Sequence, residues 1–195
     1  MNTEQNVIKL VKNRECGKCT VCCTHLGIET SEIVKQPNVP CQNLMKAGGC
    51  AIYKDRPKVC DEWYCAWRNL PELDDDWRPD KMGVLLEFSR ENFPAPFTGK
   101  TGFRFTVLDK KKISSNYKLV SFLSKQIKND VPCILSYGAE SGQAPTTAFL
   151  NVAMRGIIQN GKKKDITKAI LNAVEACEKM PKEMTKIKDG KLVYF

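Results

Sequence analysis

The sequence predicts an α+β protein in two parts: a cysteine-rich N-terminal module in residues 1–80, then a mainly antiparallel sheet with two helices in residues 81–195. Eight of the ten cysteines precede residue 66, whereas regular apolar periods begin only after residue 81. Between the two parts, the acidic stretch 71–76 reads as a polar connection. At 195 residues, the chain suits one compact body in which the two parts pack together.

Composition and charge are those of a globular protein. The chain is 42% hydrophobic and 27% charged, which excludes the low hydrophobicity of disordered chains. Its formal net charge of +9 is uneven, because residues 1–80 hold 11 basic and 12 acidic side chains while residues 81–195 hold 20 and 10. Residues 1–14 lack the apolar core of a signal peptide, and no apolar run approaches the roughly 18 residues of a membrane span. We therefore expect a cytoplasmic protein with no membrane partner.

The second part alternates between strand-like and helical patterns. Apolar side chains at alternate positions of residues 103–108 predict a strand with one buried face. From residue 116 to residue 128, apolar side chains recur at helical spacing. Asp165 is a good N-cap for a second helix, which Pro181 ends. The other expected strands are residues 82–88, 131–137, 146–152 and 191–195.

Eight cysteines within 50 residues are the strongest functional signal in the chain. They are Cys16, Cys19, Cys22, Cys23, Cys41, Cys50, Cys60 and Cys65. Because the cytosol keeps thiols reduced, closely spaced cysteines there ligate metal more often than they form disulfides. Cys16 and Cys19 form a C-x2-C pair, in which Gly17 gives the backbone freedom for both thiolates to reach one ion. The sequence therefore predicts a metal site built from these eight thiols.

The number of cysteines predicts up to two all-thiolate centres, because a closed zinc site or a cubane iron–sulfur cluster uses four ligands. Cys22 and Cys23 are adjacent, and in extended backbone their side chains diverge, so they are expected to serve different centres or opposite sides of one polynuclear site. Spacing does not say which cysteines share a centre, and thiolates suit zinc and iron–sulfur alike. The negative charge of such centres predicts nearby cations, for which the candidates are Lys18, Lys54, Arg56, Lys58 and Arg68.

Metal ligation also explains the character of the first part. Residues 1–80 contain few long apolar periods and many small, turn-forming or charged residues. A short strand or a turn of helix at residues 27–34 is the main regular element expected there. We therefore expect a metal-stabilised module, in which ligation substitutes for a large hydrophobic core.

Three segments carry a resemblance to a known family. They are CGKCTVCC at residues 16–23, GCAIYKDRPKVC at residues 49–60 and WYCAW at residues 63–67, with Cys41 between the first two. Together they resemble the YkgJ-type CxxCxxCC cysteine-cluster family over residues 14–85, and all eight family cysteines are present. The resemblance implies zinc or iron chelation. The same region is similar to the flagellin lysine N-methylases, which would imply S-adenosylmethionine and methyl transfer to lysine.

Other residues receive plainer interpretations. Cys133 and Cys177 lie in apolar stripes and are expected to be core residues. His25, the only histidine, is expected at the surface or beside the ligands. Trp63, Tyr64 and Trp67 are expected to cover the metal site. The glycine-containing residues 137–142 match no nucleotide-binding loop and predict a hairpin turn.

Three functions remain open from the sequence. The first is a zinc- or iron-chelating cysteine-cluster protein, because no catalytic triad or acid–base pair is recognisable. The alternative is an iron–sulfur redox enzyme or an S-adenosylmethionine-linked, methyltransferase-like enzyme. The third is a zinc-dependent nucleic-acid module; nucleic acid is not an expected partner, because the basic residues lie outside the cysteine region. The partner is an unidentified protein or small molecule.

Overall fold

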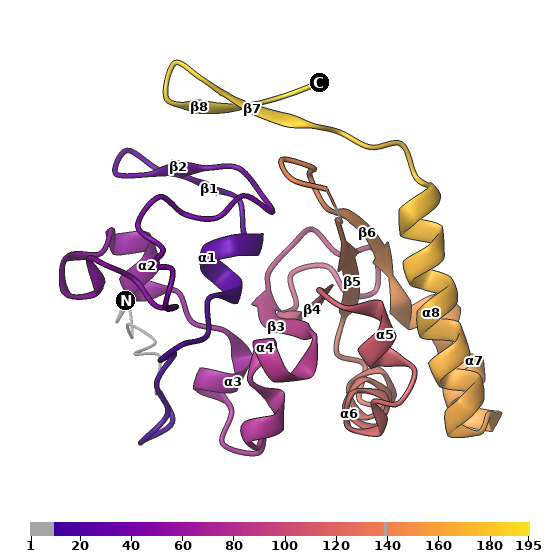
Figure 1. Ribbon diagram of the computed structural model, residues 1–195. Coiled ribbons are helices and arrows are strands. Elements are labelled where there is room, and N and C mark those ends of the chain that lie inside the picture. The colour runs from indigo at the N-terminus through magenta and orange to yellow at the C-terminus, as the bar shows by residue number, and fades with distance from the viewer. Residues whose placement is uncertain (1–9, 139) are drawn as a thin grey trace, which may run out of the picture.

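The computed structural model describes residues 10–138 and 140–195, and it confirms the α+β class (Figure 1). Most of the segment 1–14, in which no signal peptide is expected, lies outside the described residues. The cysteine-rich part lies on one side of a central sheet, and the longest helices lie on the other (Figure 1). Among the described residues, no helix is both long and apolar enough to cross a membrane.

The central sheet has four strands in the order β3-β4-β5-β6. Their bounds are β3 (Val84–Ser89), β4 (Gly102–Val107), β5 (Cys133–Tyr137) and β6 (Thr146–Phe149). The outer pairs β3–β4 and β5–β6 are antiparallel, whereas the central pair β4–β5 is parallel. A parallel pair requires a crossover connection, and α6 (Tyr117–Lys128) lies in it. The sheet is therefore mainly antiparallel, as predicted.

Three long helices, rather than the two expected, accompany this sheet. They are α6, α7 (Leu150–Asn160) and α8 (Lys163–Lys179). The expected strand at residues 146–152 is correct only up to Phe149, because α7 begins at Leu150. Leu150, Met154 and Ile158 are buried at a spacing of four residues, so the helical period overrides the strand-like start of this segment.

The beginning of α8 also differs from the prediction. Helix α8 starts at Lys163, so Asp165 lies inside its first turn and is not the N-cap. The Asp165 carboxylate instead accepts a hydrogen bond from the backbone N–H of Lys162, at 2.9 Å. An acidic residue in the first turn still complements the positive end of the helix, which explains why the predicted N-cap lay three residues late. Pro181 follows the helix end, as predicted.

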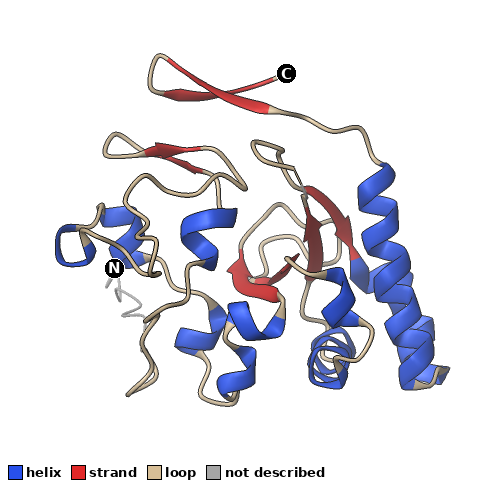
Figure 2. Cartoon of the chain, in the orientation of Figure 1, coloured by secondary structure: helices blue, strands red, loops and turns tan. Residues whose placement is uncertain are grey.

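The cysteine-rich part consists of short elements joined by loops (Figure 2). These are α1 (Val21–His25), β1 (Ile28–Glu29), β2 (Val34–Lys35), the 3-10 turn Tyr53–Asp55, α2 (Lys58–Glu62), α3 (Ala66–Asn69), the 3-10 turn Asp75–Trp77 and α4 (Pro79–Met82). β1 and β2 pair antiparallel, so the regular element expected at residues 27–34 is a strand.

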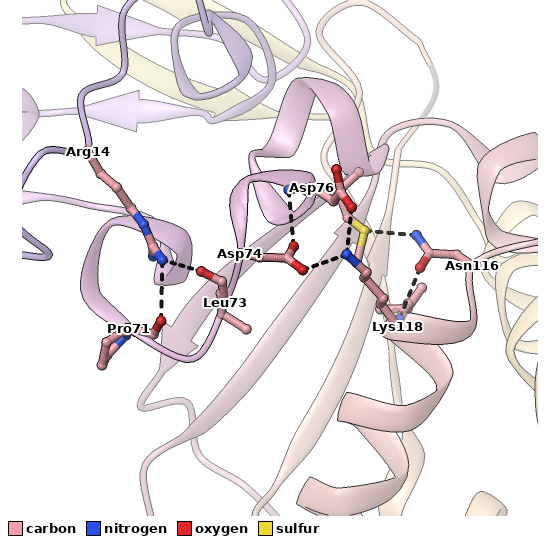
Figure 3. A network of polar contacts seen from close by, with 9 residues as sticks. Arg14, Pro71, Leu73, Asp74, Asp76, Asn116 and Lys118 are labelled. Atoms are coloured by element: carbon pink, nitrogen blue, oxygen red, sulfur yellow. Dashed lines mark hydrogen bonds and ion pairs between the residues drawn. The ribbon is translucent and has the colours of Figure 1, made fainter.

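The two parts share one hydrophobic core. Ala66 and Trp67 of α3 are buried in the same cluster as Leu85, Phe105 and other sheet residues. The acidic connection is fixed as well, because Lys118 of α6 pairs with the exposed Asp74 and Asp76 at 2.5 Å each (Figure 3). The remaining short helix, α5 (Lys110–Ile113), contributes the fully buried Ile113 to this core.

The C-terminal residues form a separate hairpin, β7 (Thr185–Lys188) with β8 (Lys191–Tyr194). The strand expected at residues 191–195 is confirmed, but its partner is β7 and not the central sheet. This hairpin lies beside β1 and β2 (Figure 1). The backbone N–H of Leu192 donates to the Glu29 carboxylate at 3.0 Å, and the Gln36 side chain donates to the Thr185 carbonyl. The end of the chain therefore closes over the cysteine-rich part.

Candidate metal centre

All eight predicted ligand cysteines line one cavity of about 600 Å³ between the cysteine-rich part and the sheet. The remaining two do not line it; Cys133 and Cys177 are 0% and 1% exposed in the core. Burial raises the pKa of the Cys133 thiol to about 12, as expected for a packing residue. None of the ten cysteines, all of which are described, forms a disulfide.

The first cysteines are held by a tight turn. The backbone N–H of Cys19 donates to the Cys16 carbonyl at 2.8 Å, and Gly17 between them has a φ of +52°, a conformation that favours glycine. Just before this turn, the Arg14 guanidinium donates to the carbonyls of Trp67 and Leu70 at 2.5 and 2.9 Å. It also reaches the carbonyls that follow α3 (Figure 3).

Cys65 joins this first group because it is the N-cap of α3, the helix to which Arg14 is bonded. Its side chain is buried, and burial raises the pKa of the Cys65 thiol to about 11. The thiols of Cys16 and Cys19 also raise this pKa, which places them within electrostatic reach of Cys65. Arg14 thus fixes residues that are distant in sequence beside one another.

A second group forms around Cys23. The backbone N–H of Cys41 donates to the Cys23 carbonyl at 2.8 Å. Cys50 pairs with Leu44 in an isolated antiparallel bridge, and the backbone N–H of Leu44 donates to the Cys41 carbonyl. Burial raises the pKa of the Cys60 thiol, and the thiols of Cys23, Cys41 and Cys50 raise it further. These four cysteines come from four separate segments, which explains why their spacing alone did not group them.

Cys22 and Cys23 join the two groups at α1. They lie in a helical turn and not in extended backbone, so their side chains leave the axis about 100° apart. Their sulfurs are 4.0 Å apart. The hydrogen bond from Cys22 lowers the pKa of the Cys23 thiol and raises that of Cys22, which favours the thiolate at Cys23.

Three cations offset the charge of these thiols. Arg68 and Arg56 lower the pKa of the Cys16 thiol against the effect of burial, and Lys35 lowers that of Cys23. Arg68 is buried, and two of its guanidinium nitrogens have no hydrogen-bond partner among the described residues. Arg56 donates to the Cys60 carbonyl at 3.1 Å and pairs with Asp61 at 2.5 Å.

Lys35 was not foreseen from the sequence. Its side chain is buried, and its ammonium donates to three backbone carbonyls, of Thr24, Gln36 and Val39, at 2.7–2.9 Å. A lysine in a strand of two residues gives no local signal for burial, because its carbonyl partners converge only once the chain has folded back within residues 24–39. Of the cations that were predicted, Lys58 pairs with Glu62 at the exposed surface.

The opposite wall of the cavity is the sheet face that turns away from the helices. It carries Glu87 of β3, Arg104 and Thr106 of β4, and Ser136 of β5. Glu87 and Arg104 are paired across the strands, with 3.6 Å between Oε1 and Nε. Glu87 Oε2 and the hydroxyl of Ser136 are buried without a hydrogen-bond partner in residues 10–138 and 140–195. Sequence patterns did not reveal this wall, because it depends on strand pairing.

His25 and the aromatic residues also line this cavity. The His25 ring contacts the Asn38 side-chain oxygen at 2.8 Å, and Asn38 in turn donates to the Gly138 carbonyl at 3.0 Å. Trp63, Tyr64 and Trp67 line the cavity beside Cys65, and Trp67 is buried in the core. Their placement agrees with the expected role of covering the thiols.

Comparisons of the chain with family models, with curated proteins and with solved structures find no match. Within the described residues, no three His, Cys, Asp or Glu side chains form a group arranged to hold one metal ion. The donor chemistry nevertheless fits zinc or iron–sulfur, since eight soft sulfur ligands line one cavity with three cations beside them.

Proposed function

We propose that this protein binds metal through two four-thiolate centres, of zinc or of iron and sulfur, as the resemblance to the YkgJ-type cysteine-cluster family implies. One observation carries the proposal. The eight cysteines come from segments up to 49 positions apart, yet all of them line a single cavity, and the two remaining cysteines are packed elsewhere. Cysteines placed only for packing have no reason to separate in this way.

The electrostatics of the cavity also support the proposal. Eight thiolates with two divalent ions carry a local charge of about −4, which the protein must offset or hydrate. Arg56, Arg68 and Lys35 provide positive charge next to the sulfurs. The two unpartnered guanidinium nitrogens of Arg68 suit hydrogen bonds to metal-bound sulfur, which commonly accepts such bonds. A cytoplasmic location belongs to the same proposal, because free thiols persist in a reducing compartment.

The test is purification without oxygen, followed by metal analysis and a visible spectrum. We expect either about two zinc ions per chain and no colour, or iron with acid-labile sulfide and absorption near 400 nm. Cys133→Ala serves as the matched control, because it removes a thiol without touching the cavity. A wild-type protein that retains no metal under these conditions would contradict the proposal.

The cavity favours a second candidate, an enzyme that acts on a small molecule at the centres. Its volume of about 600 Å³ lies in the usual range for ligand pockets, and Glu87 and Ser136 offer it buried polar atoms without partners. S-adenosylmethionine is the probe that the resemblance to lysine methylases suggests, and its cationic sulfonium complements the Glu87 carboxylate. Titration followed by tryptophan fluorescence should show saturable binding that Glu87→Gln weakens. No binding by the metal-loaded protein would remove this candidate.

A further inference from the structure

The path of the chain, and not the spacing of the cysteines, indicates which thiols belong together. We propose that Cys22 and Cys23 divide between two centres, one formed with Cys16, Cys19 and Cys65 and the other with Cys41, Cys50 and Cys60. This division rests on the proposed metal-binding function and goes beyond it, because it assigns each of the eight ligands to one centre.

The first set is defined by contacts near the start of α3. Cys16 and Cys19 share a turn, and Arg14 ties the residues before that turn to the carbonyls of Trp67 and Leu70 in and just after α3, whose N-cap is Cys65. A second tie is the 2.8 Å hydrogen bond from the Val11 backbone N–H to the Arg68 carbonyl. These bonds hold the turn of Cys16 and Cys19 near Cys65.

The second set is defined by contacts of the loop that follows β2. The bond from Cys41 to the Cys23 carbonyl fixes this loop directly to the helix, and the Leu44 bridge brings Cys50 to the same loop. Arg56 completes the arrangement because it reaches both the Cys60 carbonyl and the Tyr53 carbonyl, which follows Cys50 by three residues. Cys60 therefore approaches the loop that carries Cys41 and Cys50.

Cys22 and Cys23 must then be assigned, and their separation alone does not assign them. Two sulfurs on one tetrahedral zinc lie about 3.8 Å apart for a Zn–S distance of about 2.3 Å, so the 4.0 Å between these sulfurs suits a shared ion equally well. Their neighbours decide the assignment. Cys22 lies within electrostatic reach of the thiols of Cys16 and Cys19. The Cys23 carbonyl accepts the backbone hydrogen bond of Cys41, and the Cys23 thiol lies within electrostatic reach of Cys60.

The two sets meet at Cys23. The Cys23 thiol raises the pKa of the Cys16 thiol, and its sulfur lies 4.0 Å from that of Cys22. The two centres should therefore lie close together, with the first turn of α1 between them. Each set contains four thiols, the number that a closed zinc site or a cubane cluster requires.

The experiment compares two double variants that differ only in which adjacent cysteine is lost. Cys22→Ser with Cys65→Ser removes two thiols from one set, so one centre should remain and about half of the wild-type metal should be retained. Cys23→Ser with Cys65→Ser removes one thiol from each set, so nearly all metal should be lost. Metal per chain, measured on anaerobically purified protein, is the readout. Equal metal content in the two variants would overturn the division.

A second measurement uses the intact chain and does not depend on how the variants fold. After cadmium-113 replaces the native metal, scalar coupling between cadmium and the cysteine β-protons identifies the ligands of each ion. Cys22 should couple to the ion that is shared with Cys65, and Cys23 to the other. Coupling of both to the same ion would overturn the division. A wild-type chain that binds no metal of any kind refutes the proposed function itself, so the two failures are distinguishable.

Discussion

Arg14→Ala is the substitution that tests how the first thiols are positioned. The Arg14 guanidinium donates hydrogen bonds to the carbonyls of Trp67, Leu70, Pro71 and Leu73, across 53 to 59 residues of sequence. Figure 3 shows the bonds to Pro71 and Leu73. Hydrogen bonds from a charged donor contribute about 1.5–3 kcal/mol each, but four bonds that share one half-exposed group do not add. We expect a loss of about 2–4 kcal/mol, because the freed carbonyls at the end of α3 are partly accessible to water.

The assay is denaturant unfolding, with retention of metal against a chelator as a second readout. Arg78→Ala is the matched control, since it removes a guanidinium whose ion pair with Asp80 is solvent-exposed and contributes about 0–1 kcal/mol. Arg14→Ala should also release metal faster, because the turn of Cys16 and Cys19 loses its tie to Cys65. The reasoning is refuted if both variants unfold within about 0.5 kcal/mol of each other.

Three further predictions concern the core, the sheet face and the cysteine-rich part. Cys133→Ala and Cys177→Ala should each destabilise the protein by roughly 1 kcal/mol with unchanged metal content, whereas Cys60→Ala should lose metal; metal analysis of all three would expose a wrong assignment. Burial raises the pKa of Glu87 from 4.5 to about 7, against the effect of Arg104, so wild-type stability should fall as pH rises through this range. Glu87→Gln removes this dependence, so the free energy of unfolding of the variant should rise relative to wild type by on the order of 3 kcal/mol between pH 4 and pH 8. Unfolding free energies of the two proteins that run parallel with pH would rule this out. Finally, a chelator under reducing conditions should abolish hydrogen-exchange protection mainly before residue 80, and unchanged protection there would count against a metal-dependent module.

The elements that the sequence predicted well are those in which local pattern and final burial coincide. Leu119, Val120, Leu123 and Ile127 recur at helical spacing, and all four are buried on one face of α6. The strand at residues 103–108 behaves in the same way, because alternate apolar residues point toward the helices. In such segments the periodicity is itself the result of packing, so it can be read directly from the sequence.

Features that depend on pairing between distant segments were not predictable. The parallel pairing of β4 with β5 leaves no mark on either strand, and β7 was missed because its partner is another short, half-exposed strand. In the candidate centre, the sequence identified the set of eight thiols. Their division into two sets of four depends on contacts such as that of Cys41 with Cys23. Lys35 is buried beside the thiols, and Ser136 faces the cavity, only because the fold brings a loop or a strand there.

The C-terminal hairpin sets an order of events during synthesis. Leu192 closes onto Glu29 across 163 residues, so the hairpin that covers the cysteine-rich part leaves the ribosome well after Glu29. At about 5–20 residues per second, that interval amounts to roughly 8–30 seconds. All eight candidate thiols are outside the ribosome once Cys65 has emerged, 127 residues before Leu192. From then on they are exposed while the hairpin is still absent. If these thiols bind metal as we propose, its delivery to the growing chain does not require the finished protein to open again.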